Sequence, residues 1–240
     1  ALILTLLGYG AGTSTDDLKR SLQQIGRASI RATHTVNQLL SLARAEGSGA
    51  QMAMQRCDLA LLTMDVVQDS LPRALEKRID LGYDGALPGE AGTDLDGNPT
   101  LIKELIRNLV DNAINYTPST AAHPGVVTAR VRTDARRQLV LLQVEDSGPG
   151  IPPAERALVF EPFYRTLGTD ADGTGLGLAI VLEIAQRHGA EVVLEDAMAG
   201  RTPPGARFTV SFAARKPPVQ QDPDKVPTAA PTEPSLGPLL

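Results

Sequence analysis

Apolar residues recur at three- and four-residue spacing between Thr15 and Glu46, and this spacing predicts an amphipathic helix. Ser14 or Thr15 would cap the start of the helix, and Gly47 follows its last turn. The apolar run at residues 1–9 predicts the tail of a second helix, broken by glycines. Residues 1–46 thus predict part of a helical hairpin whose first arm would begin before residue 1.

A short polar segment, residues 47–56, predicts a linker, and the pattern of a mixed domain then runs over residues 57–215. The predicted elements are a helix at 59–77, a strand at 79–83, a helix at 100–116, strands at 126–133 and 138–146, a helix at 176–188, and strands at 190–196 and 206–212. This order predicts an α+β fold, a two-layer α/β sandwich with helices on one face of a mixed sheet. Residues 216–240 hold seven of the 18 prolines and predict a disordered tail.

Composition narrows the choice of partners. The apolar fraction of 42% and the charged fraction of 21% are typical of a globular protein, and a net charge of -5 argues against nucleic acid as a partner. Cys57 is the single cysteine, so neither an intrachain disulfide nor an all-cysteine metal site can form.

Three asparagines lie on the helix predicted at 100–116. Asn108, Asn112 and Asn115 are spaced by four and three residues, so we expect their amides along one face. Asparagine is a mediocre helix former, whereas its amide oxygen suits Mg²⁺. Exposed asparagines are also common on helices, so this motif alone leaves both interpretations open.

A glycine-containing turn, VEDSGPGIP, ends the strand predicted at 138–146. Gly148 and Gly150 allow the backbone to turn sharply, and the carboxylate of Asp146 could accept a hydrogen bond from an amino group such as that of adenine. In isolation the segment favours an ordinary tight turn.

A second glycine-rich segment, DGTGLGLAIV, precedes the helix predicted at 176–188. Gly173, Gly175 and Gly177 could turn backbone N–H groups toward a phosphate at the start of the helix. The segment follows no strand and lacks the Lys-Ser/Thr pair, so it fits neither the dinucleotide fingerprint nor the P-loop.

The order and spacing of these segments resemble the N, G1 and G2 boxes of the ATPase fold shared by histidine kinases, DNA gyrases, heat-shock chaperones and mismatch-repair proteins. The segment FEPFYR at 160–165 resembles the F box of the kinases, and the resemblance covers residues 57–214. The helix RATHTVNQLLSLARAE is similar to the second helix of the dimerisation and phosphotransfer hairpin of these kinases. The chain therefore resembles the ATP-binding, phosphoryl-donating part of a two-component sensor histidine kinase.

The resemblance implies a set of site residues and two cofactors, ATP and Mg²⁺. Asn108 and Asn112 would bind Mg²⁺, Asp146 would read adenine, and Arg165 would meet the γ-phosphate. The further nucleotide-binding residues would be Tyr116, Gly148, Gly150, Gly173, Thr174, Gly175, Leu176, Gly177 and Leu178. Residues 166–172 resemble a lid that closes over the nucleotide.

Asn108 distinguishes a kinase from a hydrolase within this resemblance. The gyrase-like branches carry a water-activating glutamate at this position, and an amide has no useful basicity. The resemblance therefore implies transfer to a histidine, with the receiver domain of a response regulator as partner. It also implies a homodimer formed by the N-terminal helices, at the cytoplasmic face of a parent chain anchored in the plasma membrane.

The sequence departs from the family pattern at two points. Asn115 stands where the family usually has Lys or Arg, and no H box with its phosphoacceptor is present. His34, His123 and His188 all lack that context, so we expect the acceptor before Ala1 of a longer chain. A degenerate nucleotide-binding dimer module, or an ATPase of the gyrase or chaperone branch, remains the alternative.

Overall fold

The computed structural model describes residues 54–165 and 174–215. The predicted hairpin at 1–46, most of the linker, the predicted lid at 166–172 and the tail at 216–240 lie outside the described residues. The elements are β1 Gln55–Asp58, α3 Leu59–Glu76, β2 Ile79–Gly85, β3 Asp94–Gly97, α4 Pro99–Tyr116, β4 Gly125–Asp134, β5 Leu139–Asp146, η1 Pro153–Glu155, η2 Leu158–Phe160, α5 Gly177–Arg187, β6 Glu191–Asp196 and β7 Ala206–Ala213.

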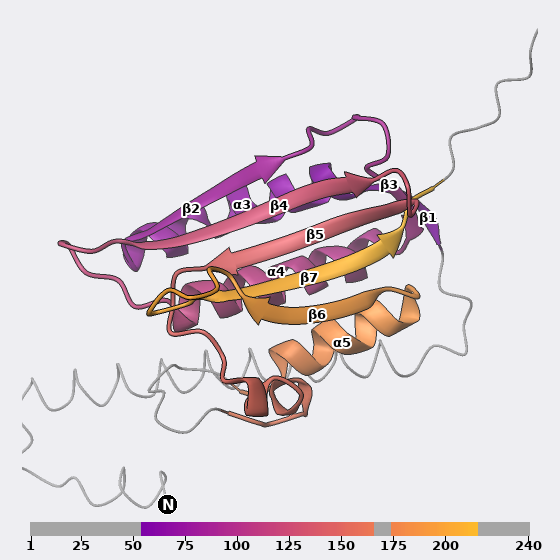
Figure 1. Cartoon of the computed structure of the whole chain (residues 1–240). Helices are drawn as coiled ribbons and strands as arrows, with labels where there is room; N and C mark the ends of the chain where they lie inside the picture. The colour runs from indigo at the N-terminus through magenta and orange to yellow at the C-terminus, as the bar shows by residue number, and fades with distance from the viewer. Residues whose placement is uncertain (1–53, 166–173, 216–240) are drawn as a thin grey trace, which may run out of the picture.

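Five strands form the main sheet in the order β2-β4-β5-β7-β6, in which β2 and β4 are parallel and the other neighbours are antiparallel. The helices α3, α4 and α5 cover one face of this sheet (Figure 1). This arrangement confirms the predicted α+β two-layer sandwich. No helix within residues 54–165 and 174–215 is long and apolar enough to cross a membrane.

Two short strands were not predicted from the sequence. β1 and β3 pair antiparallel as a separate two-stranded sheet, with Cys57 opposite Leu95. β1 begins at Gln55, inside the predicted linker. Each strand has only four residues and draws its partner from about 40 positions away, so local alternation of apolar residues carries no signal for either.

Side-chain caps fix where two of the helices begin. Asp58 Oδ1 accepts the N–H groups of Ala60 and Leu61 at 2.9 and 3.2 Å at the start of α3. Asn98 caps α4 in the same way, and Pro99 occupies the first helical position. The caps set the starting point of α4, on which the three asparagines lie.

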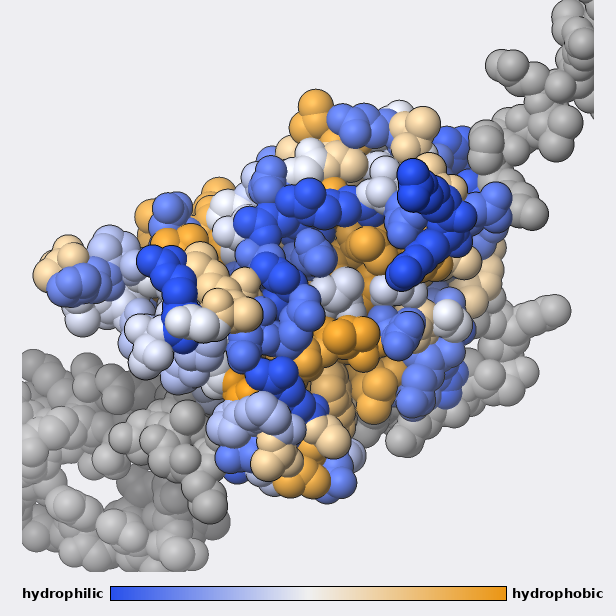
Figure 2. Space-filling model, viewed as in Figure 1, coloured by the Kyte–Doolittle hydropathy of each residue, from blue (hydrophilic) through white to orange (hydrophobic). Residues whose placement is uncertain are grey.

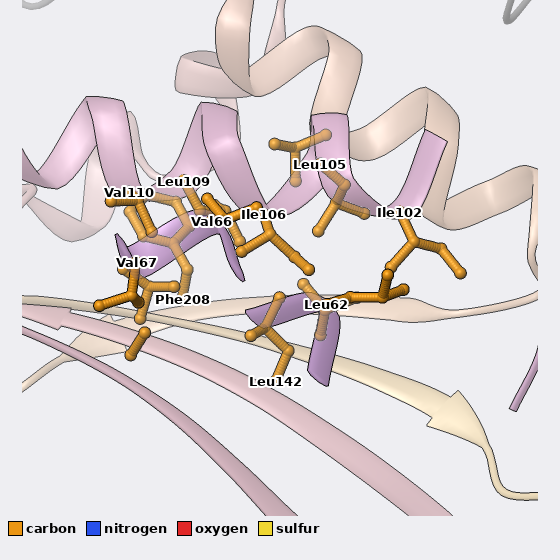
Figure 3. Close-up of a cluster of buried hydrophobic side chains, with 14 of the residues drawn as sticks. Leu62, Val66, Val67, Ile102, Leu105, Ile106, Leu109, Val110, Leu142 and Phe208 are labelled. Carbon is orange, nitrogen blue, oxygen red and sulfur yellow. The ribbon is translucent and has the colours of Figure 1, made fainter. Parts of the chain in front are cut away.

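The core lies between the helices and the sheet. α3 contributes Leu62, Val66 and Val67, α4 contributes Ile102, Leu105, Ile106, Leu109 and Val110, and Leu142 and Phe208 project from β5 and β7 (Figure 3). Most of these side chains are aliphatic, so burial of branched carbon supplies the main driving force for folding.

A ladder of polar contacts joins α3 to α4 on the side away from this core. Three residues of α3 and its C-cap residue, Lys77, follow one another at four-residue intervals, and each contacts a residue of α4 that lies 38 positions later. The rungs are Asp65–Lys103 at 2.6 Å, Asp69–Arg107 at 3.3 Å, Arg73–Asp111 at 2.5 Å and Lys77–Asn115 at 2.7 Å. The constant offset shows that the two helices run parallel to each other.

The face of the sheet without helices is open and mostly polar, with smaller apolar patches between the hydrophilic residues (Figure 2). A chain of ion pairs crosses all five strands on this face. It runs from Asp84 through Arg130, Glu145 and Arg207 to Glu195. Glu145 directly precedes Asp146, so the chain of ion pairs also fixes the end of β5.

Candidate nucleotide-binding site

Asp146 ends β5 with one carboxylate oxygen held and the other open. Its Oδ1 accepts the N–H of Gly148 at 2.8 Å and that of Ala206 at 3.2 Å. Oδ2 accepts no hydrogen bond from the residues that the structure describes. Burial raises the pKa of Asp146, and the two N–H groups partly offset that rise. The open oxygen is a fixed acceptor for a donor such as an amino group.

The turn after Asp146 is packed so closely that only glycine fits. A Cβ on Gly148 would lie 2.9 Å from Asp146 Oδ1 and 3.0 Å from the carbonyl oxygen of Tyr116. Gly150 has a φ of 73°, and a Cβ there would lie 2.8 Å from Pro204 Cγ. The turn that follows Asp146 therefore packs against the end of α4, as expected for one end of a ligand site.

Gly205 is a contact residue of this turn that the sequence did not reveal. It has a φ of 68°, and a Cβ there would lie 2.1 Å from the carbonyl oxygen of Asp146. Its N–H donates to the carbonyl oxygen of Gly148 at 3.1 Å. The Pro-Pro-Gly run could have indicated a turn here, but not its contact with Asp146.

Thr117, next to Tyr116, carries a buried hydroxyl without a partner. It is 6% exposed, and among the described residues its Oγ1 is the one buried side-chain oxygen or nitrogen that makes no hydrogen bond. A Cβ on Gly148 would lie 3.6 Å from the Thr117 Cα, so this hydroxyl belongs to a residue that flanks the turn.

Asn108 is turned toward the start of α5. It is 8% exposed, and its Nδ2 donates to the carbonyl oxygen of Glu104 at 2.9 Å and to Glu104 Oε1 at 3.2 Å. Its Oδ1 lies 3.1 Å from the position of a Cβ on Gly177. The amide oxygen is thus aimed at the N-terminus of α5, beside which a phosphate would lie.

The other two asparagines differ from each other. Asn112 is half-buried one turn after Asn108, whereas the Oδ1 of Asn115 accepts from Arg73 at 2.8 Å and from Lys77 at 2.7 Å. The amide of Asn115 therefore turns toward α3, so the expectation that the three amides lie along one face does not hold for Asn115. Tyr116 is half-buried at the end of α4.

The second glycine-rich segment is joined to the F box. The N–H of Phe163 donates to the carbonyl oxygen of Gly175 at 2.9 Å. Gly175 has a φ of 73°, and a Cβ there would lie 2.7 Å from the Phe163 carbonyl carbon. Phe163 itself has a φ of 66° and is 66% exposed. Such a φ is strained for an aromatic residue, and this hydrogen bond helps to hold it.

α5 starts with its first-turn N–H groups uncapped by a side chain. Leu176, at the N-cap position, is fully buried, and its own N–H donates to Thr174 Oγ1 at 3.3 Å. Leu178 is half-buried against the core. A helix start with open N–H groups favours an anion such as phosphate.

Two remaining site predictions lie at the edge of the described residues or beyond it. Arg165 is exposed and is the last described residue before 166–173. Gly173 lies outside the described residues. Of the three histidines, His188 lies at the end of α5 and His123 is exposed in the loop before β4. His34 lies outside the described residues.

The donor set fits a nucleotide with a divalent cation. The turn after Asp146 lies against the C-terminal end of α4, and Asn108, one turn before Asn112 on the same helix, faces the start of α5. No group of three or more His, Cys, Asp or Glu side chains gathers in the described ranges. A cation here would be shared between amide and phosphate oxygens, as Mg²⁺ prefers. Fold and site together define an ATPase-type nucleotide-binding domain.

The comparisons with known proteins identify the family. Residues 97–216 match the family described as histidine kinase-, DNA gyrase B-, and HSP90-like ATPase, which is half of the chain. The chain belongs to this family and binds ATP as its members do. The resemblance to the ATP-binding region of a sensor histidine kinase is confirmed.

Curated relatives point to one branch of the family. The chain is 36% identical over 181 residues to the signal transduction histidine-protein kinase/phosphatase MprB of Mycobacterium sp. (strain KMS), covering 75% of this chain and 32% of the relative. The MprB of Mycobacterium avium (strain 104) is 40% identical over 153 residues, covering 63% of this chain and 28% of the relative. The chain spans about a third of the length of these relatives.

Solved structures support the same branch. A mycobacterial sensor histidine kinase MprB aligns with a TM-score of 0.55 and 29% identity over 68% of this chain and 99% of that chain. The catalytic domain of the histidine kinase ThkA aligns with a TM-score of 0.56 and 25% identity, over 69% of this chain and 100% of that chain. Full-length ShkA in complex with AMPPNP aligns with a TM-score of 0.65 and 25% identity, over 86% of this chain and 41% of that chain.

Proposed function

We propose that this chain is the catalytic part of a histidine protein kinase of two-component signalling, which binds Mg·ATP and transfers the γ-phosphoryl group to a histidine upstream of residue 1. The observation that supports it best is Asn108. Its Nδ2 donates to the carbonyl oxygen of Glu104 and its Oδ1 faces the start of α5, where the phosphates would bind. An amide can position a metal–phosphate complex but cannot deprotonate water.

The residues of the chain divide the work between the two ends of the nucleotide. The open Oδ2 of Asp146 would accept from the adenine amino group, and Tyr116 would pack beside the ring. The N–H groups at the start of α5 would hold the phosphates, and Arg165 would stabilise charge on the γ-phosphate. Mg²⁺, held by Asn108 and Asn112, would neutralise phosphate charge.

The reaction itself needs an acceptor that brings its own nucleophile. A neutral imidazole nitrogen would form the N–P bond while the bond between the γ-phosphorus and the ADP oxygen breaks. The names of the relatives support this reading, because MprB is named a histidine-protein kinase/phosphatase and ShkA binds AMPPNP. An ATPase of the gyrase or chaperone branch is disfavoured, since the water-activating position holds Asn108.

Transfer of label from γ-labelled ATP tests this proposal. We expect no acid-labile label on the chain alone, and labelling of a histidine helix supplied in trans or restored upstream of Ala1. Asn108→Asp should lose the transfer, because a carboxylate changes the metal ligands and repels the triphosphate. Label on the chain alone would contradict the upstream acceptor. Binding of ATP without any transfer would support the degenerate module instead.

The partners follow from the same assignment. A response regulator receiver domain would take the phosphoryl group, and two chains would associate through the predicted N-terminal helices at the cytoplasmic face of a plasma-membrane parent protein. Sedimentation should show a weak dimer of the full chain that Leu39→Asp and Leu40→Asp dissociate. A monomer at high concentration, unaffected in stability by both changes, would contradict the dimer.

A further inference from the structure

Two glycines define the surroundings of Thr117. A Cβ on Gly125 would lie 2.5 Å from Thr117 Cγ2, and a Cβ on Gly148 would lie 3.6 Å from Thr117 Cα. The register of β4 and β5 pairs Val127 with Asp146. Two residues further out, Gly125 and Gly148 therefore lie opposite each other. Thr117 packs over the start of β4 and the turn after β5, where neither position carries a side chain.

The hydroxyl of Thr117 points away from the start of β4. The methyl carbon, Cγ2, faces Gly125, and Oγ1 is bonded to the same Cβ, so the two groups take different directions. Beside Thr117, a side chain on Gly148 would fill a small space. The position of its Cβ lies 2.9 Å from Asp146 Oδ1 and 3.0 Å from the carbonyl oxygen of Tyr116. Thr117 and Asp146 are thus neighbours on two sides of Gly148.

The missing partner of this hydroxyl indicates a ligand. Thr117 is 6% exposed, and its Oγ1 makes no hydrogen bond within the described part of the chain. Burial of an unpaired hydroxyl costs free energy, so such groups in folded proteins are normally satisfied by protein, water or a ligand. A threonine hydroxyl can donate a hydrogen bond, whereas the ionised carboxylate of Asp146 can only accept. The two side chains therefore offer a donor and an acceptor side by side.

The edge of adenine has the complementary pattern, because its amino group donates and the adjacent ring nitrogen, N1, accepts. The proposed contact of the amino group with Asp146 Oδ2 leaves N1 in need of a donor. We infer that the Thr117 hydroxyl donates to N1 of adenine, directly or through one water, and is a second base-binding side chain of the nucleotide site. This inference rests on the proposed binding of ATP and adds a contact outside the asparagine and glycine motifs.

A purely structural role for Thr117 predicts a different outcome. If the hydroxyl only held an internal water, its removal would lower the free energy of unfolding and leave nucleotide affinity unchanged. In the base-binding role, its removal weakens every ligand that carries adenine, whatever the number of phosphates. The ligand-free chain then keeps or gains stability, because a buried hydroxyl without a partner is removed.

Calorimetry and urea unfolding of the full chain separate the two roles. Thr117→Val keeps the shape of the side chain without its hydroxyl and should weaken ATP and ADP binding equally, about three- to tenfold, with no loss of stability. Thr117→Ser keeps the hydroxyl and should retain the affinity. Thr63→Val is the matched control, because it removes a fully buried hydroxyl that donates to the carbonyl oxygen of Leu59 at 2.7 Å. This control should lose stability and bind normally.

An ADP analogue in which a C–H group replaces N1 tests the atom itself. Thr117→Val should not weaken binding of this 1-deaza analogue, because the acceptor is already absent. Unchanged ADP affinity in Thr117→Val, or an equal loss for ADP and the analogue, would overturn the inference. Thr117→Ala serves for the same comparison if the valine variant does not fold. Failure of the unmodified chain to bind ATP would instead contradict the proposed function, which keeps the two failures distinct.

Discussion

At the scale of single residues, Asp146 combines a buried position with a ligand role. Its pKa is raised by burial, so the ionised carboxylate is less stable there than in water. An amide at this position would keep an oxygen for the N–H groups of Gly148 and Ala206 but would lose the charged acceptor. Stability and ligand binding therefore place opposite demands on this side chain.

Asp146→Asn should weaken ATP binding about 10- to 100-fold, as expected for the loss of a charge-assisted hydrogen bond. Stability of the ligand-free chain at neutral pH should stay equal or rise slightly, because the raised pKa shows that the buried charge opposes folding. Calorimetry and urea unfolding measure the two effects. Asp80→Asn, exposed on β2, should change neither.

The same raised pKa predicts the direction of a pH effect on binding. As the pH falls through the raised pKa of Asp146, the carboxylate is protonated and no longer accepts a hydrogen bond from adenine. ATP affinity should therefore begin to decline at a pH above 3.8, the pKa of an ordinary aspartate. A pH profile of affinity that is flat down to that value would contradict the placement of adenine at Asp146.

Gly177 offers a test of Asn108 that does not touch Asn108. Its alanine Cβ would lie 3.1 Å from Asn108 Oδ1, so the amide would shift by a few tenths of an ångström. Gly177→Ala should weaken Mg·ATP binding about three- to tenfold, while alanine keeps or improves the helix by up to about 1 kcal/mol. Gly82→Ala, with open space around it, is the control. Unchanged Mg·ATP affinity would contradict the proposal that Asn108 helps to bind Mg²⁺ and the phosphates.

At the scale of elements, the turn between β6 and β7 controls the end of β5. Gly200 and Gly205 both have positive φ values, 80° and 68°, but only Gly205 touches Asp146. Gly200→Ala should lower stability by about 1–2 kcal/mol through backbone strain. Gly205→Ala should lower it by about 1–3 kcal/mol more, because its Cβ overlaps the Asp146 carbonyl oxygen. If urea unfolding gave the same loss of stability for Gly200→Ala and Gly205→Ala, the contact between Gly205 and Asp146 would contribute nothing to stability.

His188 links the end of α5 to the start of α4. Its Nδ1–H donates to the carbonyl oxygen of Ile184 at 2.7 Å, and its Nε2 accepts the N–H of Asn98 at 3.0 Å. Burial lowers the pKa of His188 below its ordinary value of 6.5. A proton on Nε2 would remove the acceptor for Asn98, so only the neutral ring joins the two helices.

The sign of the pH effect follows from that lowered pKa. Stability from neutral His188 is present above pH 6.5 and is lost as the pH falls through the lower pKa of the folded state, because the unfolded chain binds the proton first. His188→Gln should flatten this part of the stability–pH profile, measured by urea unfolding. His123→Gln, exposed in a loop, should leave it unchanged.

The elements that the sequence predicted are those with a local signal. The three helices with periodic apolar residues were found within two residues of their predicted ends, and the five longer strands were found as well. β1 and β3 were missed because their pairing is non-local. The nucleotide motifs were recognisable in sequence, since each needs glycine or amide residues at fixed spacing.

At the scale of the whole molecule, the contacts between motifs could not be read from the chain. Asp146 is held by Ala206, 60 residues later, and Asn115 by two cations of α3 about 40 residues earlier. Such contacts depend on how the sheet and helices pack, and a polar residue in sequence does not reveal its distant partner. The distant partners of Asp146 and Asn115 therefore had to be seen in three dimensions.

The reversal of charge halfway along the α3–α4 ladder has a mechanical consequence. Apolar packing between two parallel helices is not directional, so it would tolerate sliding by one turn, about 5.4 Å. Such a slip would bring Arg73 opposite Arg107 in one direction and Asp69 opposite Asp111 in the other. Because the signs reverse halfway, either slip creates a like-charge pair and leaves fewer opposite-charge pairs than the three of the observed register. The ladder thus fixes the axial position of α4 relative to α3, and with it the position of Asn108 and Asn112 along the sheet.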